Sequence, residues 1–365
     1  MNIIFSSLKQ RQCWRKVHLY LALLASAPLL LIAITGIVLA FDMYIRALVN
    51  PQTVANPLQL PVLPMENIVA TAQNQFPELT LHMIVAPKSS WHAYLIYASK
   101  QVGKKRPFYR LYINPYDANI TAIQNKPTLP LTFIKRIHRN LLLDQTGRYI
   151  VATSSIILML LSLVGIYLWW PMRRRTISRA IKKKQRISIH NLVGIAALPM
   201  LLMLAFTGIT VTFKSVVMPF VFIITQSAPL PAKPTSLDKV KTPVLASQVL
   251  TQARAEYPNM KVTSLGLPKP NTAKPYSVRL RHKNDVHPMG WLTVFYDVNT
   301  GEKLAHHNTA EQSIAAQYNQ LWYPLHTGEV LGFIGAILWS IVCILLIYLI
   351  YSGILLWNKR RTKIA

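Results

Sequence analysis

Histidine occurs in this chain in two matched pairs, and each of these histidines stands beside a long apolar segment. His18 and His190 each open such a segment and lie 17 residues before the threonine of a Thr-Gly pair. His138 and His326 each precede another apolar segment and lie 27 residues before a glycine. Ionisable side chains in or near a bilayer are costly and rare, so four histidines at repeated spacings indicate a functional site.

Four apolar segments are long enough to cross a bilayer as helices, which takes about 20 residues. The first follows a basic N-tail, as a secretory signal would. It is longer than the roughly 7–15 apolar residues of a signal peptide and has no small-residue cleavage site, so we expect it to remain as a span. The predicted transmembrane helices are 17–41, 148–171, 189–213 and 331–357.

The charged residues predict how these spans are oriented. The N-tail 1–16, the connection 172–188 and the C-tail 358–365 together hold 16 of the 40 Lys and Arg residues and none of the 12 Asp and Glu residues. By the positive-inside rule these three segments are cytoplasmic. We therefore expect both termini inside and the long loops, 42–147 and 214–330, outside.

Composition excludes several classes of protein. The formal net charge of +28 does not indicate nucleic-acid binding, because 16 of the basic residues flank predicted spans. The two cysteines, Cys13 and Cys343, belong to a cytoplasmic tail and a span, so they cannot form a structural disulfide. The chain has no Cys-x-x-Cys-His for covalent haem, no Gly-x-Gly-x-x-Gly fingerprint and no Walker loop.

The sequence repeats, and we interpret it as an internal duplication of one unit: span, outer domain, span. The two halves have the same orientation, related by an axis along the membrane normal. Each outer loop, entered through a proline-rich linker at 50–64 or 227–243, predicts an α+β domain in which a meander follows one helix. The predicted helices are 65–76 and 244–257, and the strands are 80–85, 93–98, 108–113, 120–123, 261–265, 276–281, 291–296 and one ending near 305.

The chain resembles the PepSY-associated transmembrane family. The resemblance is carried by this layout, by the early histidine of the first span, by the histidine before the second span and by the Asp-x-x-Thr-Gly-Glu turn at 297–302. Within it the chain is most similar to inner-membrane siderophore (ferric) reductases of the FoxB type. The first outer domain departs from the turn motif, since 117–119 reads Asp-Ala-Asn without a glycine. The resemblance implies a bacterial inner-membrane reductase with haem b in a four-helix bundle and PepSY-like periplasmic domains.

Low-spin haem b takes two neutral imidazoles from facing helices. Depth in the membrane pairs His18 with His190 and His138 with His326 as axial ligands, which predicts two haems per chain. Pairing across leaflets would separate two ligands by most of the ~30 Å hydrocarbon thickness. We expect His138 and His326 on helical extensions of the second and fourth spans. The repeated glycines, which would let a macrocycle or a neighbouring helix approach, are Gly36, Gly208, Gly165 and Gly353.

Several basic residues near the histidines could contact haem propionates. Those on the inner side could equally well be positively charged flanks of the spans or lipid anchors. The candidates are Arg15, Lys16 and Arg186 on the inner side and Arg136, Arg139 and Arg148 on the outer side. In the outer domains, the adjacent His306 and His307 are candidates for meeting a substrate or metal complex. No nucleophile–base or acid–base pair is evident, so the sequence predicts no hydrolytic residues.

Three functions remain open. The first is a haem-dependent transmembrane oxidoreductase that passes electrons from quinol, or from a cytoplasmic flavin or flavoprotein, to a ferric siderophore or other ferric chelate in the periplasm. The second is a non-enzymatic PepSY membrane protein that binds a peptide or protein partner, which leaves the matched histidines unexplained. The third is a transporter, against which stand the few spans and their lack of a buried acidic residue.

Overall fold

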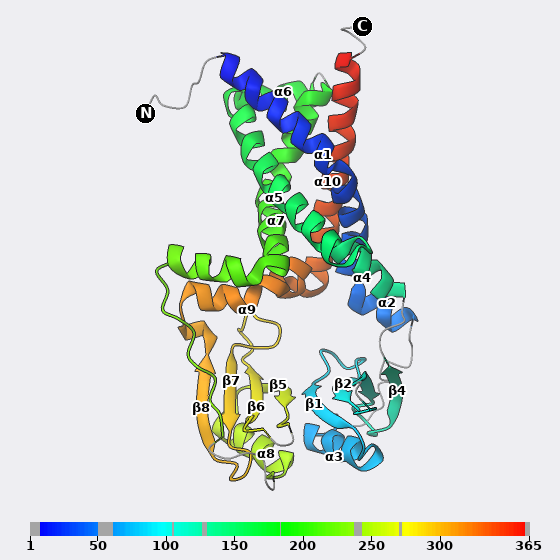
Figure 1. The fold of residues 1–365 in the computed structure, drawn as a ribbon, viewed down its shortest axis with the longest axis vertical. Coiled ribbons are helices and arrows are strands. Elements are labelled where there is room, and N and C mark those ends of the chain that lie inside the picture. The colour runs from blue at the N-terminus through cyan, green and yellow to red at the C-terminus, as the bar shows by residue number, and fades with distance from the viewer. Residues whose placement is uncertain are drawn as a thin grey trace. The chain divides into compact units, whose positions relative to one another are not determined.

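The computed structural model describes residues 8–49, 61–103, 106–125, 130–182, 184–236, 243–269 and 272–361. The ends of both predicted tails, most of the proline-rich linker 50–64 and a part of the linker 227–243 lie outside the described residues. The chain divides into two compact units, which we describe separately (Figure 1). The helical unit comprises 1–42, 129–224 and 321–365, and the sheet unit comprises 43–128 and 225–320.

The helical unit is built on four helices that are long and apolar enough to cross a membrane. These are α1 (Leu8–Ala40), α5 (Asp144–Trp169), α7 (Arg186–Ile224) and α10 (Gly332–Arg361). Helices α1 and α7 each pack against both α5 and α10, so the four helices form a ring with α1 and α7 on one diagonal. Helix α7 bends at Phe213, the last residue of the predicted third span, where the backbone leaves helical geometry.

Small side chains let these helices pack closely. On α1, Ala25, Leu29 and Ala33 are buried at a spacing of four residues, which places them on one helix face. The core of α7 repeats this pattern with Ala197, Leu201 and Ala205. Because apolar side chains gain nothing by leaving lipid, close approach through small residues is what holds membrane helices together.

Three shorter helices complete the helical unit or lead into it. They are α4 (Pro130–Asn140), α6 (Arg173–Ile181) and α9 (Ile314–Thr327), of which α9 crosses the boundary between the units. Helix α4 packs against α1 and α5, and α6 packs against α7. Two of these helices, α4 and α9, carry His138 and His326.

The described strands of the sheet unit form one antiparallel sheet with the order β4-β3-β2-β1-β5-β6-β7-β8. The strands lie where the sequence predicts them, with ends shifted by at most three residues. Their bounds are β1 Thr80–Val85, β2 Tyr94–Ser99, β3 Phe108–Ile113, β4 Ile120–Asn125, β5 Lys261–Gly266, β6 Tyr276–Arg281, β7 Leu292–Tyr296 and β8 Lys303–Asn308. Helix α2 (Asp42–Val49) belongs almost wholly to this unit.

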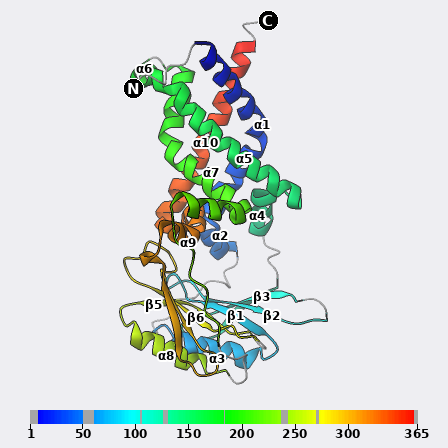
Figure 2. The same ribbon diagram turned by 60° about the vertical axis from the view of Figure 1, so that its left-hand side comes forward.

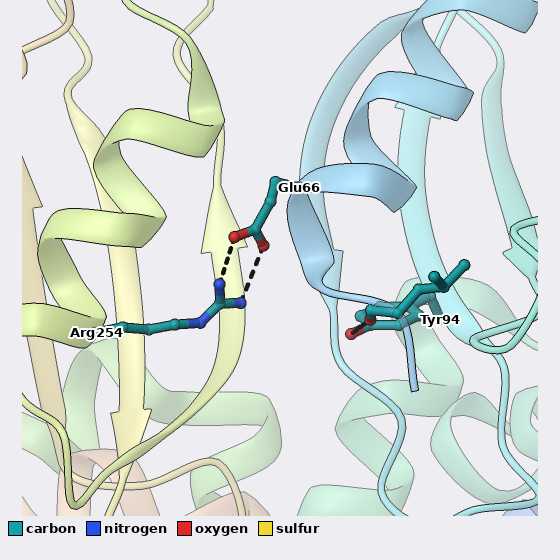
Figure 3. Close-up of polar contacts among 4 residues, drawn as sticks. Glu66, Tyr94 and Arg254 are labelled. Carbon is teal, nitrogen blue, oxygen red and sulfur yellow. Dashed lines mark hydrogen bonds and ion pairs between the residues drawn. The ribbon is translucent and has the colours of Figure 1, made fainter. Parts of the chain in front are cut away.

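Two helices, α3 (Met65–Gln75) and α8 (Ala246–Glu256), share one hydrophobic core with the strands. They lie side by side, as Figure 2 shows. Alternate strand residues such as Ile84, Ile96 and Leu265 are fully buried under them, as the period of two in a strand requires. An ion pair also joins the helices, since the Arg254 guanidinium holds the Glu66 carboxylate through two contacts (Figure 3).

The strands of the two long loops, 42–147 and 214–330, form one sheet rather than two separate sheets, which differs from the expectation of two self-contained domains. Strands β1 and β5 pair directly, with Ile84 opposite Leu265. An edge strand exposes a row of unpaired backbone groups that invites association with another chain. Pairing β1 with β5 satisfies one such edge from each half, and a sequence pattern within either half cannot show this.

The Asp-x-x-Thr-Gly-Glu motif forms the turn between β7 and β8. The Asp297 carboxylate accepts hydrogen bonds from the backbone N–H of Asn299 and Thr300, and Gly301 has a positive φ of 76°. The corresponding turn of the first half places Ala118 at φ 58°, a conformation that costs a non-glycine residue more than glycine. The first half therefore forms its turn without glycine, but under strain.

Candidate functional site

His138 and His326 do not lie on extensions of the second and fourth spans, which corrects the expectation from sequence. Helix α4 ends at Asn140, and positive φ angles at Leu141 and Leu142 separate it from α5. Between α9 and α10, Gly328 and Gly332 have positive φ angles. These breaks make α4 and α9 separate helices that do not continue α5 and α10. His138 therefore approaches α1, and His326 approaches α7.

The rings of His138 and His326 lie close together. Their centres are 6.2 Å apart and their planes are inclined by 59°. A metal bound by two imidazoles has metal–nitrogen bonds of about 2 Å, and each ring centre lies about 1 Å beyond its nitrogen, so the centres stand about 6 Å apart. The spacing of the outer pair therefore fits two axial ligands of one metal ion.

Hydrogen bonds determine which ring nitrogen of His138 is available to bind a metal. Its Nδ1 lies 3.1 Å from the carbonyl oxygen of Ile32, and because a carbonyl can only accept, Nδ1 carries the proton. The same nitrogen lies 3.0 Å from Oγ1 of Thr35, whose own hydroxyl donates to the Leu31 carbonyl at 2.6 Å. Nε2 consequently keeps its lone pair, as a metal ligand must.

His326 has the matching arrangement on the opposite diagonal helix. Its Nδ1 lies 2.9 Å from Oγ1 of Thr207, and that hydroxyl donates to the Met203 carbonyl at 2.7 Å. With its proton committed to the helix, the Thr207 oxygen accepts from Nδ1, which again leaves the lone pair on Nε2. Hydrogen bonding of this kind orients a ligating imidazole and raises its basicity.

The inner pair, His18 on α1 and His190 on α7, is less symmetrical. Both rings are half-buried. Nδ1 of His190 lies 2.7 Å from Oγ of Ser352, which donates to the Leu349 carbonyl at 3.2 Å. The corresponding position in the first half is Val164, and Nδ1 of His18 is buried without a hydrogen-bond partner among the described residues.

Each histidine lies beside one of the four repeated glycines of a neighbouring helix. A Cβ added at Gly36 would stand 3.4 Å from Cε1 of His138, and one at Gly208 would stand 3.6 Å from Cε1 of His326. At Gly165 and Gly353 the corresponding distances, to Cε1 of His18 and of His190, are 3.8 and 3.9 Å. Any larger side chain at these positions would extend into the space beside the rings, so glycine keeps that space open.

The predicted propionate-binding residues are mostly exposed. Arg15, Arg186 and Arg139 are exposed, and Arg148 donates to the Gln145 side chain at 3.3 Å. Contacts from any of them to a propionate stay a prediction. Arg11 was missed as a candidate for contacting a propionate. It is half-buried, and its Nη2 donates to the Leu168 carbonyl at 3.2 Å. Its Nε is buried without a partner among the described residues. It precedes His18 by seven residues, a spacing that could have identified it as a neighbour on the same helix face.

In the sheet unit, His306 and His307 are successive residues of β8, so their side chains point to opposite faces of the sheet. His306 is exposed, whereas the His307 ring packs edge-on against Phe295 at 5.2 Å. They do not form a pair, and a role for either in substrate binding stays a prediction. Among the described residues, no cluster of three or more His, Cys, Asp or Glu side chains could hold a metal ion.

A buried polar network in the sheet unit also escaped the sequence analysis. Arg279 on β6 contacts the ring of His287, and its guanidinium also bonds the Gln320 amide oxygen and, at 3.1 Å, the Gly290 carbonyl. Burial lowers the pKa of Arg279 to about 10, and burial together with Arg279 lowers the pKa of His287 to about 4. His287 is thus neutral at physiological pH, and the network ties β6, the loop after it and the first part of α9 together.

Sequence reasoning found the four histidines and the four glycines but missed the hydroxyl groups that orient the rings. Thr35 and Thr207 served only as markers of spacing, and Ser352 was not considered. A usable signal was present, because each hydroxyl residue directly precedes one of the repeated glycines.

Comparison with known proteins gives one family. The sequence model of the PepSY-associated TM region matches residues 15–360. No curated protein matches the chain.

Proposed function

The chain belongs to the PepSY-associated transmembrane family, and on this basis we propose that it is a di-haem b oxidoreductase of a bacterial inner membrane. It would take electrons on the cytoplasmic side and deliver them to a periplasmic ferric siderophore, releasing ferrous iron for uptake. Hydroxamate and catecholate oxygens are hard ligands that favour Fe(III) over Fe(II), so reduction would loosen the complex.

The observation that carries this proposal is the outer histidine pair. The two imidazole ring centres are 6.2 Å apart, and each ring has Nδ1 within hydrogen-bond distance of a hydroxyl that donates its own proton to a helix carbonyl. Ordinary packing of two histidines would not require both lone pairs to be left on Nε2. A glycine beside each ring lets that ring lie close to the neighbouring helix, and the absence of a side chain would also let a flat macrocycle approach the backbone.

The four histidines would hold the cofactors: His138 and His326 one haem b, His18 and His190 the other. Bound haem supplies one-electron redox chemistry, which no side chain of this chain supplies. Thr35, Thr207 and Ser352 keep their imidazoles neutral and oriented. Arg11 lies on the same helix face as His18, and its Nε is buried without a partner among the described residues, so it is suited to a propionate of the inner haem.

The proposed topology follows from charge. The inner segments hold 16 basic residues and no acidic ones, which favours a cytoplasmic position for both termini and a periplasmic position for the sheet unit. We further propose that the chain arose by duplication. The same offset of 172 residues relates His18 to His190 and Ala25, Leu29 and Ala33 to their counterparts on α7.

The electron donor must come from elsewhere, because the sequence contains no dinucleotide fingerprint. Quinol in the membrane, and a cytoplasmic flavin or flavoprotein at the basic inner face, are both consistent with an inner haem near the cytoplasmic ends of α1 and α7.

The absorption spectrum of the purified protein tests the proposal. We expect low-spin bis-histidine haem b, about two per chain, that dithionite reduces. Acid–acetone should extract all of it, because no Cys-x-x-Cys-His can hold haem covalently. A colourless preparation from haem-replete cells would refute the oxidoreductase and favour a binding protein without enzymatic activity.

The hydroxyl groups of Thr35 and Thr207 should set how tightly the outer haem binds. Thr207→Val removes the acceptor for the Nδ1 proton of His326, and Thr35→Val removes one of two acceptors near Nδ1 of His138, the other being the Ile32 carbonyl. Both substitutions keep the shape of the side chain. Loss of such a partner typically weakens metal binding roughly 10- to 100-fold. In a titration of haem-depleted protein we expect a loss of that size for Thr207→Val and a smaller loss for Thr35→Val, because the Ile32 carbonyl still accepts from His138. The midpoint potential of the outer haem should shift as well.

Two variants control this experiment. Thr35→Ser keeps the hydroxyl and should behave as wild type, and Ser340→Ala removes a buried hydroxyl of α10 that bonds only the Ala336 carbonyl among the contacts described. Equal haem affinity and potential in the valine variants and wild type would show that the hydroxyls do not support ligation.

A further inference from the structure

A group of polar side chains lies around the ends of β1, β2 and β5 in the sheet unit. We call it the His82 cluster: His82 on β1, Ser99 on β2, Arg106 just before β3, and Lys269 and Lys274 in the loop between β5 and β6. Strands β1 and β2 are paired neighbours. The loop is tied to β1 because the backbone N–H of Leu267 donates to the His82 carbonyl at 3.0 Å.

The hydrogen bonds within the cluster leave one donor without an acceptor. Ser99, which is fully buried, accepts from Nε of Arg106 at 3.0 Å, and its Oγ lies 2.7 Å from Nε2 of His82. Among the described contacts Ser99 has no other acceptor for its proton, so we assign that proton to the bond with Nε2 and the proton of the neutral imidazole to Nδ1. That nitrogen is buried and has no hydrogen-bond partner among the described residues. A ligand oxygen that accepts from it would remove the penalty of an unsatisfied buried donor.

The charges around His82 have one sign. Burial, and then the positive charges of Arg106, Lys269 and Lys274, lower the pKa of His82, and no carboxylate is among the groups described as acting on it. Lys274 is also influenced by Lys269 and Lys233, and its ammonium donates to a neutral acceptor, the Leu267 carbonyl, at 3.2 Å. Cations held together without a counter-charge repel each other, and a bound anion removes that repulsion.

We propose that the His82 cluster binds the acceptor of the protein, and that this acceptor is a ferric complex with net negative charge, of the polycarboxylate or catecholate class. The inference rests on the proposed function and names its substrate class. The guanidinium of Arg106 presents a fork suited to a pair of ligand oxygens, while the two lysines act as point charges. A complex without net charge would gain none of this attraction.

Equilibrium dialysis of the full-length oxidised protein in detergent measures binding without electron transfer. The probes are radioactive ferric–EDTA, which is anionic, and the neutral ferric tris-acetohydroxamate. We expect ferric–EDTA to bind at least about tenfold more tightly, with an affinity that falls as salt is added. Lys269→Gln/Lys274→Gln should remove about tenfold of that preference. His82→Ala should reduce the affinity for ferric–EDTA while leaving that for the neutral complex unchanged.

The matched control is Lys261→Gln/Lys283→Gln, which removes the same charge from two exposed lysines outside the cluster. Equal losses in the control and cluster variants, or equal affinities of wild type for the two complexes, would overturn the inference. Competition by calcium–EDTA or phosphate as strong as that by ferric–EDTA would show a general anion site and would overturn recognition of a ferric complex. The haem spectrum, recorded on the same samples, shows separately whether the proposed function holds.

Discussion

Replacing both His138 and His326 by alanine should remove one haem per chain and abolish reduction of ferric complexes on the outer side of the membrane. The two rings are the ligands of one proposed site, 6.2 Å apart, so loss of both leaves no axial nitrogen. We expect the haem content to fall from about two to about one per chain. The remaining haem should still be reducible from the cytoplasmic side.

Right-side-out vesicles test this result, with a ferric siderophore outside and the membrane-impermeant ferrous trap ferrozine as the indicator. Ferrous iron should form only at the rate of vesicles that lack the protein. His92→Ala/His282→Ala, which changes two histidines outside the helical unit, should keep both haems and the wild-type rate. Unimpaired ferric reduction in the His138→Ala/His326→Ala variant would remove the outer haem from the electron path, and the proposed mechanism would have to be abandoned.

Replacing His18 or His190 should remove the other haem and block electron entry. Because α1 and α7 are diagonal helices that carry these rings at corresponding positions, His18→Ala and His190→Ala should lose the same spectral component. Reduction by a cytoplasmic donor should then fall to background. The outer haem should remain and should still accept electrons from a ferrous chelate added outside.

The pairing is tested by combining variants. A His18→Ala/His190→Ala protein should have the same haem content as either single variant, whereas His18→Ala/His138→Ala should have no low-spin bis-histidine haem. If His18→Ala and His138→Ala lost one common haem while the other stayed intact, the pairing by depth would be wrong.

Most of the secondary structure was predictable because it depends on local patterns. The apolar lengths identify four helices, and the alternation in segments such as Tyr276–Arg281 identifies strands. The sequence could not show that β1 pairs with β5, because this pairing joins residues such as Ile84 and Leu265 that no local pattern relates. The hydroxyl residues could have been found beside the repeated glycines, but which hydroxyl meets which histidine depends on the tertiary packing.

Repetition in the sequence was enough to identify the four histidines and the four glycines as a set, because duplicated spacings persist whatever the tertiary arrangement is. Only the tertiary structure decided which histidine lies beside which glycine. The repeated spacing of 27 residues relates His138 to Gly165. The ring of His138 nevertheless lies beside Gly36, which precedes it by 102 residues. The physical reason is that left-handed residues at Leu141 and Gly328 separate α4 from α5 and α9 from α10. The His138 ring therefore packs against α1 and the His326 ring against α7.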